Sequence, residues 1–552
     1  MIAGMPYTND NFKDAMSFSS AQRASIAREI FFTAAIAAIG LAIYVQWGAS
    51  DAGDKRWLLL AARMVLSGKH LYDDIFETNL PLIVWLYTVP AFLASHIREV
   101  ADTQILTLLV LCLVVCSAAV SVRLMARHPE FAGNAKKRGA FALLLCFVYL
   151  LWAPPTLFGD REHLFLLLAF PYILRCSPSL AGAALPISLR LAVACMGAVG
   201  FCIKPHCVVV FLGMQALVIW RERSPRILLS MENLIICGAG AVYLLLVYLF
   251  APTFFYAVLP MEIATYGYYS WGWSVNARNF FPALAVISIV MTAFHRCDVS
   301  PYRADALYFL GICASFVLYI LANNGWGYTF YPLDSMVLFT VAWLWWEFRW
   351  LKRDASARGV VPVSRIQGEH VCALVLVAVS ALVMFFYDAV LTGEMTAPVE
   401  TKVIAEFART IREHHARSFG CLIPTFNACS EPARKTDARL ETRFHHLWMM
   451  PAFAAEGKEF AAKYARIPTY VATKLAEDME YNKPDLMFVD TSPEFFVVHK
   501  PFDLVAYFST TLAFKEAWRH YRYIKEINYC EPSRAGKKTG TGCSFAIYAR
   551  AF

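Results

Sequence analysis

Charged side chains are scarce in this chain of 552 residues. Asp, Glu, Lys and Arg make up 17% of it, whereas 58% is hydrophobic and the mean hydropathy is +0.48. A water-soluble protein of this length needs considerably more charge to cover its surface. The apolar residues also gather in runs of membrane-spanning length, separated by short polar segments. This composition excludes a large soluble core and predicts a membrane protein.

Several other patterns are missing. The sequence has no internal repeat and no low-complexity segment, and beyond residue 390 it has neither a glycine-rich phosphate loop nor a Cys/His metal signature. No small-residue cleavage site follows the first apolar run, which starts near Ile30, so we expect an uncleaved signal anchor. The net charge of +8 falls mainly in particular short loops, where orientation in a membrane explains it better than nucleic acid does.

The apolar runs predict a polytopic α-helical membrane protein with about eleven transmembrane helices. Segment Leu80–Ser95 is apolar enough to span, but counting it would place the basic loop Arg123–Arg138 outside the cytoplasm, against the positive-inside rule. We therefore expect Leu80–Ser95 to lie in or dip into the interface. The predicted spans are then residues 29–48, 103–124, 138–154, 162–176, 188–204, 206–220, 232–251, 280–295, 305–322, 332–348 and 371–390.

This topology predicts two domains, a membrane domain over residues 1–390 and an outer domain over residues 391–552. The first outer loop, residues 49–102, contains an amphipathic segment, Lys55–Leu66, that we expect to form a juxtamembrane helix on the bilayer. The outer domain has mixed α/β patterning, with a predicted helix over Thr401–Arg417 and predicted strands over Asp485–Asp490 and Phe545–Arg550.

Four of the 15 cysteines lie in the outer domain, whereas most others lie in apolar helices, where Cys behaves as a small hydrophobe. An even number at close spacing fits two disulfides in an oxidising compartment. The sequence does not fix the pairing; we favour Cys421–Cys429 and Cys530–Cys543.

The polar residues that could take part in binding or catalysis gather on the predicted outer side. Ionisable groups at or near membrane depth are costly, so they are functional candidates. In the first outer loop, Asp54 could act as general base for a hydroxyl, or it could cap the amphipathic helix. Asp51, Glu77 and Asn79 of the same loop are candidate substrate-binding residues, with loop solvation as the alternative.

A second polar group, Asp160-Arg161-Glu162-His163, comes directly before an apolar helix. Arg161 could bind a phosphate, and Asp160, Glu162 or His163 could hold a divalent metal cation. The alternative is an interfacial cap whose charges neutralise one another.

Lys204 follows a further apolar run and precedes a proline, so it could bind a phosphate or extend to lipid headgroups. Trp326 and Tyr328, which lie among amides and glycines, could form a sugar-binding platform or part of an interfacial aromatic belt.

Together these features resemble the GT-C superfamily of membrane glycosyltransferases, in the branch of the lipid A aminoarabinose transferases, rhizobial galacturonosyltransferases and protein O-mannosyltransferases. The resemblance begins with Asp54-Lys55-Arg56-Trp57 and runs through Tyr72-Asp73-Asp74 to Asn79-Leu80-Pro81. It implies that Asp54 is the catalytic base. Two departures stand out: Thr329 occupies a position where His is common, and Lys55 replaces the second acid of the usual pair, which weakens a metal site in this loop.

The resemblance also implies a function. We expect a polyprenyl-phosphate-linked sugar as donor and an envelope glycolipid, glycan or protein as acceptor, with inverting transfer at the periplasmic face of the bacterial inner membrane. One alternative is a secondary transporter, but those usually have internal repeats and midplane binding residues. A second alternative is an enzyme like the O-antigen ligases or polymerases.

Overall fold

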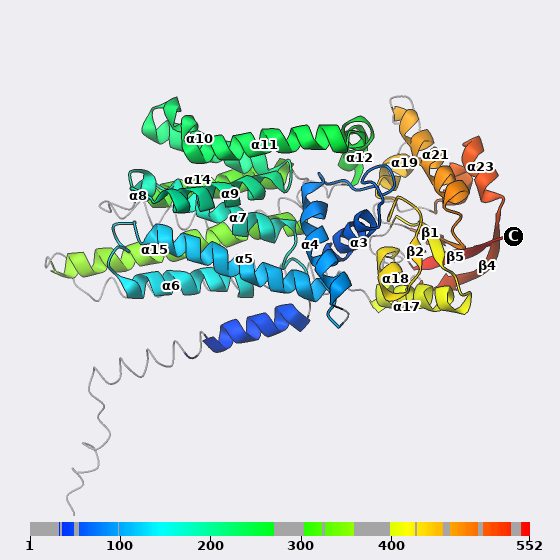
Figure 1. The fold of residues 1–552 in the computed structure, drawn as a ribbon, viewed down its shortest axis with the longest axis horizontal. Helices are drawn as coiled ribbons and strands as arrows, with labels where there is room; N and C mark the ends of the chain where they lie inside the picture. Colours follow the sequence, from blue (N-terminus) through cyan, green and yellow to red (C-terminus); the bar gives the residue numbers. More distant parts are fainter. Residues whose placement is uncertain are drawn as a thin grey trace, which may run out of the picture.

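The computed structural model describes residues 33, 36–48, 54–97, 99–269, 303–322, 326–357, 398–424, 428–455, 464–494, 501–530 and 543–551. Figure 1 shows two parts, a bundle of long helices and a smaller unit of helices and strands at one end of it. The predicted spans 280–295 and 371–390, and the predicted domain boundary at 390/391, lie outside these residues.

The bundle is built from helices that run along its long axis (Figure 1). Two of them, α5 and α11, are long and apolar enough to cross a membrane. The apolar side chains of Leu245, Leu249 and Phe250 on α11 are more than half exposed, a surface that suits lipid better than water. The helices of the bundle are α5 (Asp102–Met125), α6 (Ala135–Cys146) with its continuation η1 (Phe147–Leu151), α7 (Arg161–Arg175), α9 (Ile187–Cys202), α10 (Cys207–Glu222), α11 (Met231–Phe250), α14 (Arg303–Ala322) and α15 (Phe330–Ala357).

Short elements join these helices. At the end opposite to the smaller unit lie α8 (Pro178–Ala181) and η2 (Pro225–Leu229). After α11 come η3 (Phe254–Val258), α12 (Leu259–Thr265) and η4 (Tyr266–Tyr269), and η5 (Gly327–Thr329) precedes α15. Small residues allow close helix contacts: a Cβ atom on Gly213 of α10 would clash with the Ser315 side chain of α14.

Two helices of the first outer loop, α3 (Lys55–Leu66) and α4 (Leu82–His96), lie between the bundle and the smaller unit. Figure 1 shows α4 running across the direction of α5 and α11, the arrangement expected of a segment that lies in the interface. Helix α3 is more enclosed than a helix on a bilayer surface, because residues Lys55 and Trp57–Ala62 are buried. Of its polar residues, Arg56 is largely enclosed and pairs with Glu431 of the smaller unit, whereas Arg63 is exposed.

The smaller unit contains a five-stranded sheet in the order β2-β1-β3-β5-β4. Strand β1 pairs in parallel with β2 and β3, and β5 pairs antiparallel with β3 and β4. The strands are β1 (Ser418–Leu422), β2 (Arg439–Leu440), β3 (Leu486–Asp490), β4 (Tyr521–Asn528) and β5 (Ser544–Arg550). The helices are α17 (Pro398–Glu413), α18 (Ser430–Lys435), α19 (Met450–Ala455), α21 (Arg466–Tyr481), α22 (Leu504–Phe508) and α23 (Leu512–Trp518).

Strands β3 and β5 and helix α17 lie where the sequence predicts them, within a few residues, and β1, β2 and β4 were not predicted. Strand β1 contains Gly420, which has low strand propensity, yet all five of its residues are buried. The structure contains the disulfides Cys421–Cys429 and Cys530–Cys543, the pairs favoured from the sequence.

Replacing Cys530 and Cys543 together by Ser should lower the free energy of unfolding of the smaller unit by about 2–4 kcal/mol, since the bond closes the connection between β4 and β5. The measurement is heat or denaturant unfolding of the full chain in detergent. Cys195→Ser, at an exposed free cysteine, is the control and should change nothing. Equal stability of the double variant and the control would contradict a structural role for this bond.

Candidate functional site

Two ion pairs at the end of the bundle nearest the smaller unit bring together four predicted site residues. Asp54, directly before α3, pairs with Arg161 at the start of α7. Glu162 of α7 pairs with Lys204, which lies in the turn between α9 and α10. Three of these side chains are at most 7% exposed, and Asp54 is 21% exposed. We call these four residues the polar cluster.

Local sequence features fix the start of α7. Asp160 is the N-cap residue of α7, and its Oδ1 accepts a hydrogen bond from the Arg161 backbone N–H at 2.7 Å. Gly159 has φ +84°, and a Cβ atom there would lie 3.1 Å from a methyl of Val110. The two charged residues that follow Asp160 are thereby placed on the first turn of a buried helix.

Lys55 ties the start of α3 to the loop before α7. Its buried Nζ donates to the carbonyls of Pro155 and Phe158, both at 3.0 Å. Because Asp54 is the neighbouring residue, this contact holds its carboxylate close to Arg161. Lys55, which stands where the family resemblance leads us to expect an acid, therefore positions the start of helix α3.

The aromatic ring of Tyr328 lies close to both cations of the polar cluster, Arg161 and Lys204. Lys204 Nζ lies 4.7 Å from the centroid of the Tyr328 ring, and the Arg161 guanidinium carbon lies 5.7 Å from it. The Trp326 and Tyr328 rings are nearly parallel, with an interplanar angle of 5°. Tyr319 donates to Glu162 Oε1 at 3.3 Å, and Glu162 Oε2 is buried without a hydrogen bond from any described residue.

Glu77 lies beside the polar cluster. Its Oε1 accepts from the Asn79 backbone N–H at 2.8 Å and from the Asn79 side-chain amide, and its Oε2 accepts from the Trp57 indole. Glu262 of α12 is a further acid of this region that the sequence analysis missed. It acts electrostatically on both Glu77 and Lys204, so it lies close to them. Its only sequence signal is a single acid in an otherwise apolar stretch.

Burial changes the acidity of the carboxyls here. It raises the pKa of Asp54 above the ordinary value of 3.8, and the positive charge of Arg161 opposes the rise. The pKa of Asp160 is raised for the same reason, against the same opposing charge. The pKa of Glu262 lies well above 4.5 because of burial and then of the neighbouring Glu77. Asp54 is therefore a stronger proton acceptor, once ionised, than an exposed aspartate.

The predicted metal ligands are only partly brought together. His163 is used within the fold: its Nδ1 accepts from the Gly159 backbone N–H and its Nε2 donates to the Tyr149 carbonyl, both at 3.0 Å. Among the described residues there is no group of three or more His, Cys, Asp or Glu side chains placed to hold a metal ion. A metal role for Asp160 and Glu162 stays a prediction, and Asp51 lies outside the described residues.

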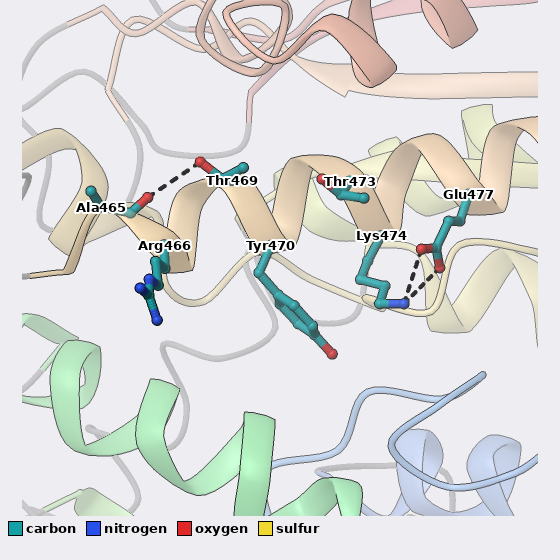
Figure 2. A pocket seen from close by; sticks show the side chains of 7 residues that line it. All are labelled: Ala465, Arg466, Thr469, Tyr470, Thr473, Lys474 and Glu477. Atoms are coloured by element: carbon teal, nitrogen blue, oxygen red, sulfur yellow. Dashed lines mark hydrogen bonds and ion pairs between the residues drawn. The ribbon is translucent and has the colours of Figure 1, made fainter.

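A separate hollow of about 640 Å³ lies on α21 and contains none of the predicted site residues. Figure 2 shows Arg466, Tyr470 and Lys474 extending from one side of that helix, with Lys474 paired to Glu477. The remaining residues that line it are Ala465, Thr469 and Thr473. No charged residue in it is buried, so we take the polar cluster as the candidate site.

Comparison with solved structures finds similarity to ArnT from Cupriavidus metallidurans in the apo state, with 13% sequence identity and a TM-score of 0.43 over 95% of this chain and 98% of that chain. ArnT is a lipid A aminoarabinose transferase, a GT-C enzyme. No protein-family model and no curated protein matches the chain. The function proposed below rests on the side chains of the polar cluster.

Carbodiimide labelling of Asp54 at a series of pH values tests its environment, because a carbodiimide reacts with protonated carboxyls. The midpoint should lie above pH 3.8, and Arg161→Gln should move it higher because the cation that opposes the rise is removed. The extent of labelling is read by mass spectrometry of the peptide. Arg56→Gln, which removes a cation that pairs with Glu431 instead, is the matched control and should leave the midpoint in place. An unchanged midpoint in Arg161→Gln would contradict the pairing.

Proposed function

We propose that this protein is a glycosyltransferase that moves a sugar from a polyprenyl-phosphate-linked donor to an envelope glycolipid, glycan or protein. The reaction takes place at the periplasmic face of the bacterial inner membrane. One observation carries the proposal: a largely buried carboxylate, Asp54, is held by the same arginine that stands next to a second buried cation, Lys204. A base beside two cations is the arrangement that transfer from a phosphate ester requires.

The two cations suit the donor phosphate. Arg161 offers a planar pair of N–H donors, and Lys204 offers a compact charge under the Tyr328 ring. Without donor both are neutralised by carboxylates, Arg161 by Asp54 and Lys204 by Glu162. When a phosphate binds between them, it takes over part of this pairing. The same two cations then stabilise the charge that develops on the phosphate as it leaves.

Asp54 serves as the base in this scheme. Once phosphate binds Arg161, the Asp54 carboxylate is free to accept the proton of the acceptor hydroxyl. The acceptor oxygen forms a bond to the anomeric carbon as the bond from that carbon to the phosphate oxygen breaks. The electron pair leaves with polyprenyl phosphate, the proton stays on Asp54, and the configuration at the sugar inverts.

The aromatic residues of η5 and η4 suit the sugar. The Trp326 and Tyr328 rings are almost parallel, and the Tyr266 side chain lies beside both, so the three form one platform. Sugar rings pack their C–H faces against such surfaces. If a divalent cation takes part, Asp160 and Glu162 are the residues that would hold it, and the free Oε2 of Glu162 provides one ligand atom.

Asp54→Asn should reduce transfer at least about 100-fold, because the amide keeps the shape but cannot take the proton. Envelope glycolipids are compared by mass spectrometry in a deletion strain that expresses either the Asp54→Asn variant or the wild-type chain. The glycolipid that disappears when the gene is deleted identifies the product. Binding of undecaprenyl phosphate to the purified variant, followed by native mass spectrometry, should persist.

Asp74→Asn is the matched control, because Asp74 is an exposed acid of the same loop whose carboxylate accepts from the His70 backbone N–H. It should leave the product at wild-type level. Near-normal product in Asp54→Asn at equal expression would remove Asp54 as base. A deletion strain with an unchanged set of envelope glycans would remove the glycosyltransferase proposal.

A further inference from the structure

A row of four buried side chains connects the smaller unit to the edge of the polar cluster. The Trp57 indole N–H donates to Glu77 Oε2. On its other side the Trp57 ring stacks on His445, with centroids 3.6 Å apart and an interplanar angle of 15°. His446 Nδ1 lies 2.6 Å from His445 Nε2, so one ring donates to the other. All four side chains are 9% exposed or less.

The two histidines are neutral, because burial lowers the pKa of His446 to about 3 and that of His445 well below 6.5. They therefore add no charge to Glu77. Their effect on it passes through the Trp57 ring, which is held on one face by His445.

The segment that carries His445 and His446 is held in place by further contacts with the first outer loop and with α21. The Phe76 backbone N–H donates to the Arg443 carbonyl at 2.9 Å, and the Phe76 and Phe444 rings lie 4.8 Å apart. Arg443 in turn donates from its guanidinium to Asp478 of α21 at 2.8 Å. The main chain that carries His445 thus runs directly beside the main chain that carries Glu77.

Glu77 is an unusual carboxylate for a purely structural position. It is 2% exposed, and each hydrogen bond it accepts from the described residues comes from a neutral donor, on Trp57, Thr78 or Asn79. A buried carboxylate without a paired cation is costly. In the described part of the chain, Oε1 has Asn79 and Thr78 as donors, whereas Oε2 has the indole alone and retains a second acceptor position there. Glu77 itself lies close enough to Asp54 and Glu262 for its charge to act on both carboxyls.

We propose that the smaller unit completes the catalytic site: His445 is a positioning residue that, through Trp57, fixes Glu77 Oε2 to accept a hydrogen bond from a substrate hydroxyl. This inference rests on the proposed glycosyltransferase function and deepens it. The hydroxyl belongs to the sugar or to the acceptor alcohol. The smaller unit reaches the site at a second point, where the Trp448 ring meets Tyr266 edge-on with centroids 5.7 Å apart.

Four substitutions separate positioning from general domain contact. Trp57→Phe keeps the stacked ring and removes the N–H, and should lower product about tenfold or more, because a misplaced contact group costs rate. His445→Ala removes the stack and should have a similar effect. His445→Phe restores a stacked ring and should recover most of the product. Lys69→Met breaks the ion pair of 2.7 Å with Glu441, another contact between the first outer loop and the smaller unit, and should leave product unchanged.

Product is measured by mass spectrometry of envelope glycolipids at equal expression, and binding of undecaprenyl phosphate by native mass spectrometry. Binding should be unchanged in all four variants, because Arg161 and Lys204 are intact. Loss of product with retained binding, rescued by His445→Phe, supports the proposal. The proposal is overturned if the Trp57→Phe variant forms product at the wild-type level. It is also overturned if the His445→Phe variant forms as little product as His445→Ala. If Trp57→Phe fails to fold, the two His445 variants decide. A wild-type chain that neither binds undecaprenyl phosphate nor forms product overturns the proposed function instead.

Discussion

The ion pair between Arg161 and Asp54 is the contact on which the arrangement of the site depends. It joins the residue before α3 to the first turn of α7, segments more than a hundred positions apart in the chain. An ion pair this enclosed contributes little net stability, because both charges lose their water. Losing one partner, however, leaves a buried charge without compensation. In the proposed mechanism, the pair serves to place a base and a phosphate-binding cation together rather than to supply folding energy.

Helix α3 is shared by the two parts of the molecule. Its start is tied to the bundle through Lys55, and its side is tied to the smaller unit through Arg56 and the stacked Trp57. Arg63 near its end pairs with the buried Asp102 at the start of α5, at 2.7 Å. Movement of the smaller unit would consequently move α3, and with it Asp54. This coupling gives the smaller unit a direct influence on the chemistry, whatever else it binds.

Much of the fold and many residues of the candidate site could be predicted from the sequence, whereas their contacts could not. Long apolar runs predicted the helices, and the charge bias of the loops predicted that Leu80–Ser95 would not run with them. The costly charges Asp54, Arg161, Glu162 and Lys204 stood out because each lies at the end of an apolar run. Their pairing could not be predicted, because spacing along the chain does not determine which helix ends meet.

Glu262 and His445 show most clearly which residues sequence analysis does not identify. Glu262 is a single acid in an apolar stretch and His445 is one of two adjacent histidines, and the importance of each depends on contacts with a distant segment. His163 differs, since a histidine among three other charges suggested a metal ligand, whereas in the structure both of its ring nitrogens make hydrogen bonds to the backbone. The likeness of the motifs to a family predicted Asp54, and the structure added the arginine that holds it.

Photocross-linking with a polyprenyl phosphate that carries a diazirine beside the phosphate tests the central claim most directly. The account predicts labelled peptides from the start of α7, from the turn at Lys204 and from η5 with Tyr328, all lost in competition with unlabelled undecaprenyl phosphate. Competed labelling confined to the hollow on α21 or to the opposite end of the bundle would contradict it.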